Sequence, residues 1–185
     1  MIEEMLKDVD SRMQKTLHAL IGELATIRTG RASSALVEHI KADYHGIATP
    51  INQMASISTP EAKMILIQPW DKSALKSIEK AILKSDIGLN PTNDGNVIRI
   101  VIPAVSEERR KELIKVVHKR LEDSRVALRN LRRDGLEEMR KAEKNKEISQ
   151  DDLIRTTDKL QKLIDVYIEK VDHSGKSKEA EIMEV

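Results

Sequence analysis

The residues best suited to binding chemistry in this sequence are four arginines within the stretch RVALRNLRRDG: Arg125, Arg129, Arg132 and Arg133. A guanidinium group is planar, stays charged and donates paired hydrogen bonds that match the oxygens of a phosphate. No acidic residue lies between Ser124 and Arg133. We therefore expect these side chains to repel one another unless an anionic partner, such as RNA, neutralises them.

The spacing of the four arginines places them on one side of a helix. Successive helical residues advance by about 100°, so the four side chains fall within a sector of roughly 100° beside an apolar stripe. We call Arg125, Arg129, Arg132 and Arg133 the arginine ridge. The pattern alone leaves two interpretations open, a solvated helix face and an RNA-binding surface.

A second pair of arginines, Arg28 and Arg31, flanks Thr29 and Gly30 in IRTGRAS. Gly30 suits a left-handed residue that ends a helix, and cations are favourable at that end of the helix dipole. This interpretation explains the residues without a ligand. It leaves open whether the two arginines also contact phosphate.

Catalytic patterns are missing from the sequence. The five histidines are scattered, with no HExxH spacing, and neither GxxxxGK[ST] nor GxGxxG occurs. Cysteine is absent, so thiolate chemistry is excluded. We expect no catalytic residues, no metal site and no cofactor. The alternative is an unrecognised hydrolase, whose pocket would be lined by His39, His45 or Asp43.

The composition narrows the class of protein further. With 32 basic and 31 acidic residues the chain has no general basic surface, so attraction to RNA must come from local clustering. Aromatic residues make up 2% of the chain, which argues against domains that stack single-stranded bases on aromatic side chains. The N-terminal stretch MIEEMLKDVD is acidic and lacks a continuous apolar run, so we expect no signal peptide there. The sequence also has no run of 18 apolar residues, so we expect a soluble, cytoplasmic protein without a membrane span.

The elements that must position the arginines are long amphipathic helices. Apolar residues recur at spacings of three and four from Leu6 to Ile27, and again from Leu113 to Leu131 after an N-cap at Ser106. A third helix is expected to begin at Ser149, with Asp152 completing a capping box. Gly175 should weaken that helix, and AEIMEV could resume it.

The segment between the first two helices has a different pattern. It holds all five prolines, β-like alternation in VEHIKADY and MASIST, and the apolar strands KMILIQP and VIRIVIP. DKSALKSIEKAILKSD predicts a helix with Asp71 as N-cap, and NPTNDGN predicts a turn. We interpret residues 31–105 as a small β-rich α/β domain.

These elements predict an α+β fold in which residues 1–30 and 106–185 form a long three-helix bundle. The domain at 31–105 is inserted between helices one and two, so two short chain segments join the parts. A double connection should act as a hinge near 29–31 and 103–106. Its expected residues are Thr29, Gly30, Pro103, Ala104 and Val105.

Several motifs in register resemble the bacterial ribosome recycling factor family over essentially the whole chain. They are IRTGRAS, ILKSDIGLNP, VIRIVIP, SEERRKEL and VALRNLRRD. The resemblance implies an L-shaped molecule without catalytic activity, in which the bundle binds large-subunit ribosomal RNA. The family's RNA-contacting arginines match Arg28, Arg31, Arg129, Arg132 and Arg133; Arg125 joins them through the ridge alone.

The resemblance also implies the partners. Proteins of this family bind the post-termination 70S ribosome and, with elongation factor G and GTP, promote its splitting into subunits and the release of mRNA and tRNA. We expect the chain to act as a monomer in solution. The remaining alternative is a coiled-coil adaptor or structural protein with a solvated arginine face, which would form homo-oligomers and lack salt-sensitive RNA affinity.

Overall fold

The computed structural model describes residues 1–184, and the chain in it divides into two compact units. The bundle unit consists of Met1–Thr29 and the chain from Glu107 onward, and the inserted unit is Gly30–Ser106. Gly30 and Ser106, which we expected in the bundle, therefore cluster with the inserted unit. Among residues 1–184, no helix combines the length and apolar character that crossing a membrane requires.

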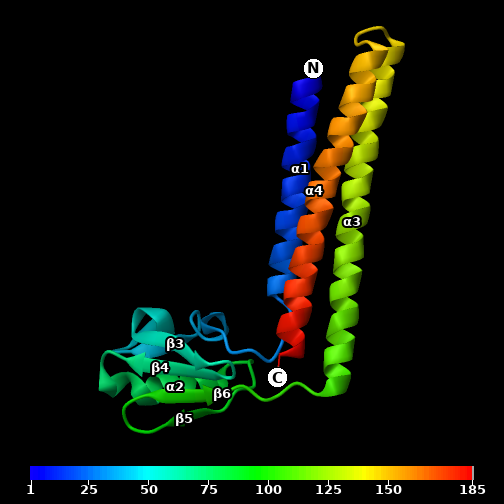
Figure 1. Cartoon of the computed structure of the whole chain (residues 1–185). Coiled ribbons are helices and arrows are strands. Elements are labelled where there is room, and N and C mark those ends of the chain that lie inside the picture. Colours follow the sequence, from blue (N-terminus) through cyan, green and yellow to red (C-terminus); the bar gives the residue numbers. More distant parts are fainter. Residues whose placement is uncertain (185) are drawn as a thin grey trace. The chain divides into compact units, whose positions relative to one another are not determined.

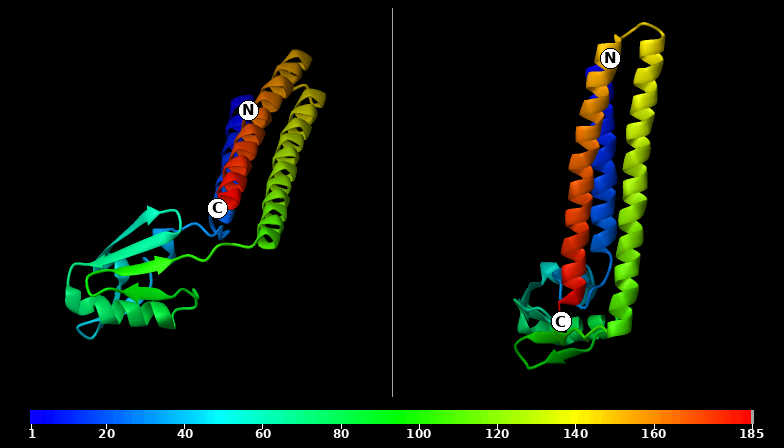
Figure 2. Two further views of the ribbon diagram at one scale, coloured as in Figure 1. Left: turned by 60° about the horizontal axis from the view of Figure 1, so that its bottom comes forward. Right: turned by 45° about the vertical axis from the view of Figure 1, so that its right-hand side comes forward.

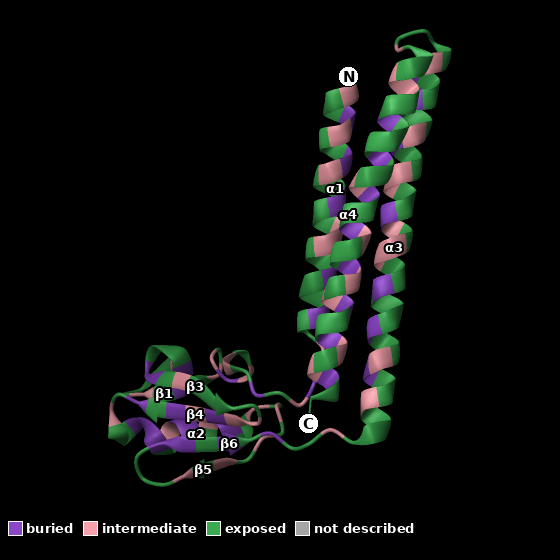
Figure 3. Cartoon of the chain, viewed as in Figure 1, coloured by how far each residue is buried: buried purple, intermediate pink, exposed green. Residues whose placement is uncertain are grey.

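The bundle unit contains three helices that lie side by side: α1 (Ile2–Ala25), α3 (Glu107–Lys144) and α4 (Gln150–Met183) (Figures 1 and 2). The expected apolar stripes form its core, which appears as buried bands on the facing sides of the helices (Figure 3). Val9, Met13, Leu20 and Leu24 of α1 are buried, as are Val117, Leu121 and Leu128 of α3. The apolar periodicity therefore predicted this unit correctly.

Helix α4 continues through Gly175 instead of weakening there, so that expectation was wrong. Gly175 is buried, and a Cβ on it would overlap the side chain of Leu121 in α3. Gly135 of α3 has the same role, because a Cβ there would lie 3.2 Å from atoms of both Met5 and Val9. Both glycines allow helices to approach closely. Val185, the last residue of AEIMEV, lies outside the described residues.

The start of α4 lies where the sequence predicted it, whereas the end of α1 does not. Ser149 caps α4: its Oγ accepts the Asp152 N–H at 3.0 Å, and Asp152 Oδ2 accepts the Ser149 N–H at 3.1 Å, which is the expected capping box. Helix α1 stops earlier than expected, and its C-cap is Thr26 in a right-handed conformation. Gly30 has a φ of +79° but lies beyond the cap, so it does not end the helix.

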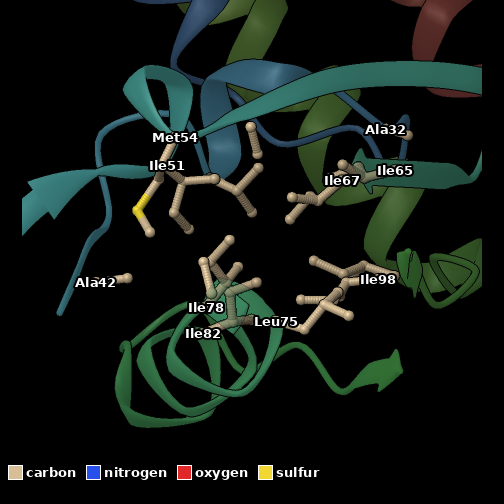
Figure 4. Close-up of a cluster of buried hydrophobic side chains, with 14 of the residues drawn as sticks. Ala32, Ala42, Ile51, Met54, Ile65, Ile67, Leu75, Ile78, Ile82 and Ile98 are labelled. Atoms are coloured by element: carbon tan, nitrogen blue, oxygen red, sulfur yellow. The ribbon is translucent and has the colours of Figure 1, made fainter. Parts of the chain in front are cut away.

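The inserted unit is built from two antiparallel sheets and one helix. Strands β1 (Lys41–Tyr44) and β2 (Ile47–Pro50) form a hairpin. A four-stranded sheet has the order β3 (Ala55–Glu61), β4 (Met64–Pro69), β6 (Ile98–Val101), β5 (Pro91–Asn93). Side chains of α2 (Leu75–Lys84) point toward those of β4 and β6, and together they make the apolar core (Figure 4).

Three expectations within this unit need correction. The strand expected in VEHIKADY is confined to its second half, Lys41–Tyr44, because residues 37–39 form a turn in which the Ile40 N–H donates to the Val37 carbonyl. NPTNDGN is only partly a turn, because Pro91–Asn93 pairs with β6 at the edge of the sheet. Asp71 caps a 3₁₀ turn, accepting the Ser73 N–H at 2.9 Å, and α2 begins after that turn.

The two connecting segments enter the inserted unit at neighbouring points. The Ala32 N–H donates to the carbonyl of Ala62 at 2.7 Å, and the Ile102 N–H donates to the carbonyl of Lys63 at 2.8 Å. Ala62 and Lys63 form the turn between β3 and β4. Both connections are therefore attached to the same hairpin end.

Candidate RNA interface

Arg125 is the most constrained member of the arginine ridge. Its Nε and Nη2 donate to Asp172 Oδ1 of α4 at 3.1 and 2.5 Å, and its Nη1 donates to Glu122 Oε2 at 3.2 Å. The side chain is 26% exposed. The hydrogen bond to Asp172 is the main cause that raises the pKa of Arg125. This arginine joins α3 to α4 and has little left to offer a phosphate.

Arg129 shares the Glu122 carboxylate, donating from Nη1 to Oε1 at 3.1 Å. The hydrogen bonds from Arg129 and then Arg125 lower the pKa of Glu122, so this side chain is a carboxylate at neutral pH. The expectation that the ridge repels itself unless an anionic partner neutralises it was therefore wrong for Arg125 and Arg129, which carboxylates of the chain itself neutralise. Glu122 lies just before the acid-free stretch, and Asp172 reaches the ridge from another helix.

The positive charges of Arg132 and Arg133 are compensated less by nearby carboxylates than those of Arg125 and Arg129. Arg132 Nη1 donates to the neutral amide oxygen of Gln161 at 2.8 Å, and Gln161 Nε2 donates to Asp165 Oδ1 at 2.8 Å. Arg133 is 64% exposed, and its nearest carboxylate oxygen, on Asp134, is 3.9 Å from its Nε. An interaction between exposed groups at that distance contributes little.

A depression of about 270 Å³ lies between α3 and α4 beside these two arginines. Its lining comprises Arg132, Arg133, Leu136, Thr157, Leu160 and Gln161. The depression thus combines two cations, two polar side chains and an apolar floor.

Arg28 does not join the ridge. Arg28 is exposed beyond the end of α1, and Arg31 belongs to the inserted unit. Helices α1 and α3 meet where Arg120 Nη1 lies 3.4 Å from Glu23 Oε2. From this contact the ridge continues along α3 in one direction, whereas the chain from Glu23 to Arg28 continues in the opposite direction. Among the five predicted RNA contacts that belong to the bundle unit, the structure therefore brings the four ridge residues together and leaves Arg28 apart.

The expected hinge residues differ in how firmly they are held. Thr29 is buried, and its hydroxyl donates to Glu181 Oε1 of α4 at 2.9 Å. A Cβ on Gly30 would lie 2.7 Å from Cγ2 of Val105, so the two connections touch there. Pro103 and Ala104 are exposed and outside regular secondary structure.

The three side chains considered for a hydrolytic pocket do not form a catalytic arrangement. His39 Nε2 lies 3.2 Å from Glu38, and His45 Nε2 lies 3.9 Å from Asp71. Both histidines and Asp43 are exposed on the inserted unit. In the part of the chain that the structure describes, no group of histidine and acidic side chains is placed to hold a metal ion.

Comparisons with known proteins identify relatives over the full chain. The family model described as ribosome recycling factor matches residues 20–183. A ribosome-recycling factor of Dehalococcoides mccartyi strain CBDB1 is 57% identical over 185 residues, covering all of both chains. The ribosome-recycling factor of Geobacillus kaustophilus is 54% identical over the same length, again covering all of both chains.

Solved structures agree with these relatives. A solution structure of the ribosome recycling factor has a TM-score of 0.74 and 44% identity, covering 100% of this chain and 98% of the other. A Thermus thermophilus ribosome recycling factor, described with Escherichia coli elongation factor G on the E. coli post-termination complex, has a TM-score of 0.64 and 43% identity, covering 99% of both chains. The sequence, the fold and these relatives together show that the chain belongs to the ribosome recycling factor family.

Proposed function

We propose that the chain binds the post-termination ribosome in the cytoplasm and, with elongation factor G and GTP, promotes its splitting into subunits and the release of mRNA and tRNA. The observation that carries the proposal is the full-length match to ribosome-recycling factors, one of which is described with elongation factor G on a post-termination complex. The chain is a translation factor and not an enzyme, so GTP hydrolysis falls to the partner.

The ridge is the part of the bundle that binds large-subunit ribosomal RNA in this proposal. Arg132 and Arg133 provide the principal phosphate contacts, because among residues 1–184 neither guanidinium has a close carboxylate partner. Arg129 contributes through the nitrogens that Glu122 does not occupy. Arg28 and Arg31 act as separate contacts near the connections. Hydrogen bonds to phosphate fix register and orientation, and the scarcity of aromatic residues agrees with this mode of binding.

The two units have different roles in the proposed reaction. The bundle unit binds the RNA, and the inserted unit, Gly30–Ser106, is an arm on which elongation factor G acts. The hinge comprises residues 29–31 and 103–106, in which Gly30 supplies a positive φ and Pro103 restricts the second connection. Attachment of both connections to one hairpin end supports a hinge with few available directions.

Subunit splitting followed by light scattering tests the proposal. Post-termination 70S ribosomes are mixed with the full-length chain, elongation factor G and GTP, and scattering should fall as subunits separate. Omission of the chain, or replacement of GTP by a non-hydrolysable analogue, should abolish the fall. The proposal is wrong if scattering is the same with and without the chain while a relative from another bacterium is active on the same ribosomes.

A further inference from the structure

The ridge arginines differ in which edge of the guanidinium group the protein occupies. Arg125 uses its Nε and Nη2 on Asp172. Arg129 and Arg132 are each held through Nη1 alone, by Glu122 and Gln161. Within residues 1–184 the Nε and Nη2 atoms of these two arginines have no hydrogen-bond partner. That edge can donate two parallel hydrogen bonds to two oxygens of one phosphate.

The acceptors that hold these arginines are themselves held. Glu122 is bound by Arg125, which Asp172 anchors to α4, so the contacts run Asp172–Arg125–Glu122–Arg129. Gln161 is bound by Asp165 one turn further along α4. An exposed arginine normally loses rotamer freedom when it binds, at a cost of about 0.5–1.5 kcal/mol. A side chain already oriented by a fixed acceptor loses less.

We propose that Glu122 and Gln161 are positioning residues of the RNA surface: each grips one nitrogen of Arg129 or Arg132 and leaves the Nε–Nη2 edge open for a phosphate. The proposal rests on the proposed function of the ridge. It assigns Arg125 a different role, because its own Nε–Nη2 edge is occupied. Arg125 is the anchor for Glu122 and not an RNA contact.

Glu122 has two opposing effects that can be separated by experiment. Its acceptor oxygen orients Arg129, which favours binding to phosphates at defined positions. Its negative charge weakens attraction to every RNA backbone, whatever the geometry. Glu122→Gln removes the charge and keeps an oxygen acceptor, the arrangement already present between Gln161 and Arg132. Glu122→Ala removes both.

The experiment compares the two Glu122 variants on two RNA targets. Affinity is measured for isolated large subunits and for a short duplex RNA of unrelated sequence. Both variants should bind the duplex more tightly than the unmodified protein, and by similar factors. The ratio of large-subunit to duplex affinity should fall about twofold to tenfold in Glu122→Ala, as the rotamer cost above implies, and should be restored in Glu122→Gln. Asp123→Asn and Asp123→Ala are the matched controls, because they change the same charge at the next position, where the described residues show no ion pair.

Each of three results would overturn a different part of the reasoning. An unchanged affinity ratio in Glu122→Ala, with weaker large-subunit binding in Arg129→Ala, overturns the positioning role and leaves the RNA surface intact. An equal loss of the ratio in Glu122→Gln and Glu122→Ala also overturns it, because the acceptor would then be irrelevant. If Arg129→Ala, Arg132→Ala and Arg133→Ala all bind large subunits normally, the proposed function of the ridge itself fails. Circular dichroism verifies that each variant is folded.

Discussion

Replacing Gly30 by alanine should destabilise the inserted unit selectively. Gly30 has a φ of +79°, a conformation that costs an L-residue with a Cβ about 1–2 kcal/mol. The new Cβ would also lie 2.7 Å from Val105 Cγ2. Val105 is half-buried outside regular structure, so rotation of its side chain relieves part of that overlap. Detachment of Ala32 from Ala62 would release the remaining strain at the cost of one hydrogen bond, which limits the loss to about 1–2 kcal/mol.

Urea unfolding followed by two signals measures this effect. Trp70 is the single tryptophan and lies in the inserted unit, so its fluorescence reports that unit. Helical circular dichroism reports mainly the bundle, whose helices have 24, 38 and 34 residues against 10 in α2. With a slope of about 2 kcal/mol per molar urea, the Trp70 midpoint should fall by about 0.5–1 M. The circular dichroism midpoint of the bundle should stay unchanged.

A second substitution separates the backbone strain from the overlap. Val105→Ala removes Cγ2, so Gly30→Ala in that background should retain the strain and lose the overlap. Most of the destabilisation should therefore persist in the double variant. The reasoning is refuted if the Trp70 midpoint does not move in Gly30→Ala, or if Val105→Ala restores it completely.

Three further predictions concern stability. Gly22→Ala should stabilise the bundle by about 0.5–1 kcal/mol, because a Cβ there has open space, whereas Gly175→Ala should give no such gain because it meets Leu121; denaturant midpoints of the two variants compare them directly. Burial raises the pKa of Tyr167 to about 12, so its contribution is complete below pH 10 and is lost as pH rises through about 12. Alkaline unfolding of Tyr167→Phe should be less steep, and an equal steepness would contradict this. Hydrogen bonds from backbone N–H groups are the main cause that lowers the pKa of Asp94 to about 2, so its contribution is present above pH 4 and is lost as pH falls through about 2. Asp94→Asn should remove that acid dependence from unfolding curves recorded between these values.

The parts of the fold that local patterns determine were predicted well. A helix buries one stripe, so the spacing of apolar residues identified α1, α3 and α4 and most of their core. Gly175 was misjudged because a glycine in a helix lowers helix propensity and also permits close packing. The partner that decides between these effects, Leu121, lies 54 positions earlier in the chain.

In the candidate site, too, contacts within one helix could be predicted from the sequence and contacts between helices could not. The ridge itself follows from helical spacing, and Glu122 could have been found, because it lies three and seven residues before Arg125 and Arg129. Asp172 and Gln161 could not, since they lie 47 and 29 positions from the arginines that they bind. Only tertiary packing of α4 against α3 brings them to the ridge. The division into anchored and available arginines therefore needed the structure.

The most direct test of the RNA surface is cosedimentation of Arg132→Ala with large ribosomal subunits across a salt series. Loss of one phosphate contact should weaken binding and reduce the slope of log affinity against log salt by about 0.7–0.9, while the bundle stays folded. Arg155→Ala is the control, because Arg155 is 72% exposed and pairs only with Asp151 among the described residues. The account predicts a shallower slope in Arg132→Ala and an unchanged slope in Arg155→Ala. Identical affinities and slopes in both variants and the unmodified protein would contradict it.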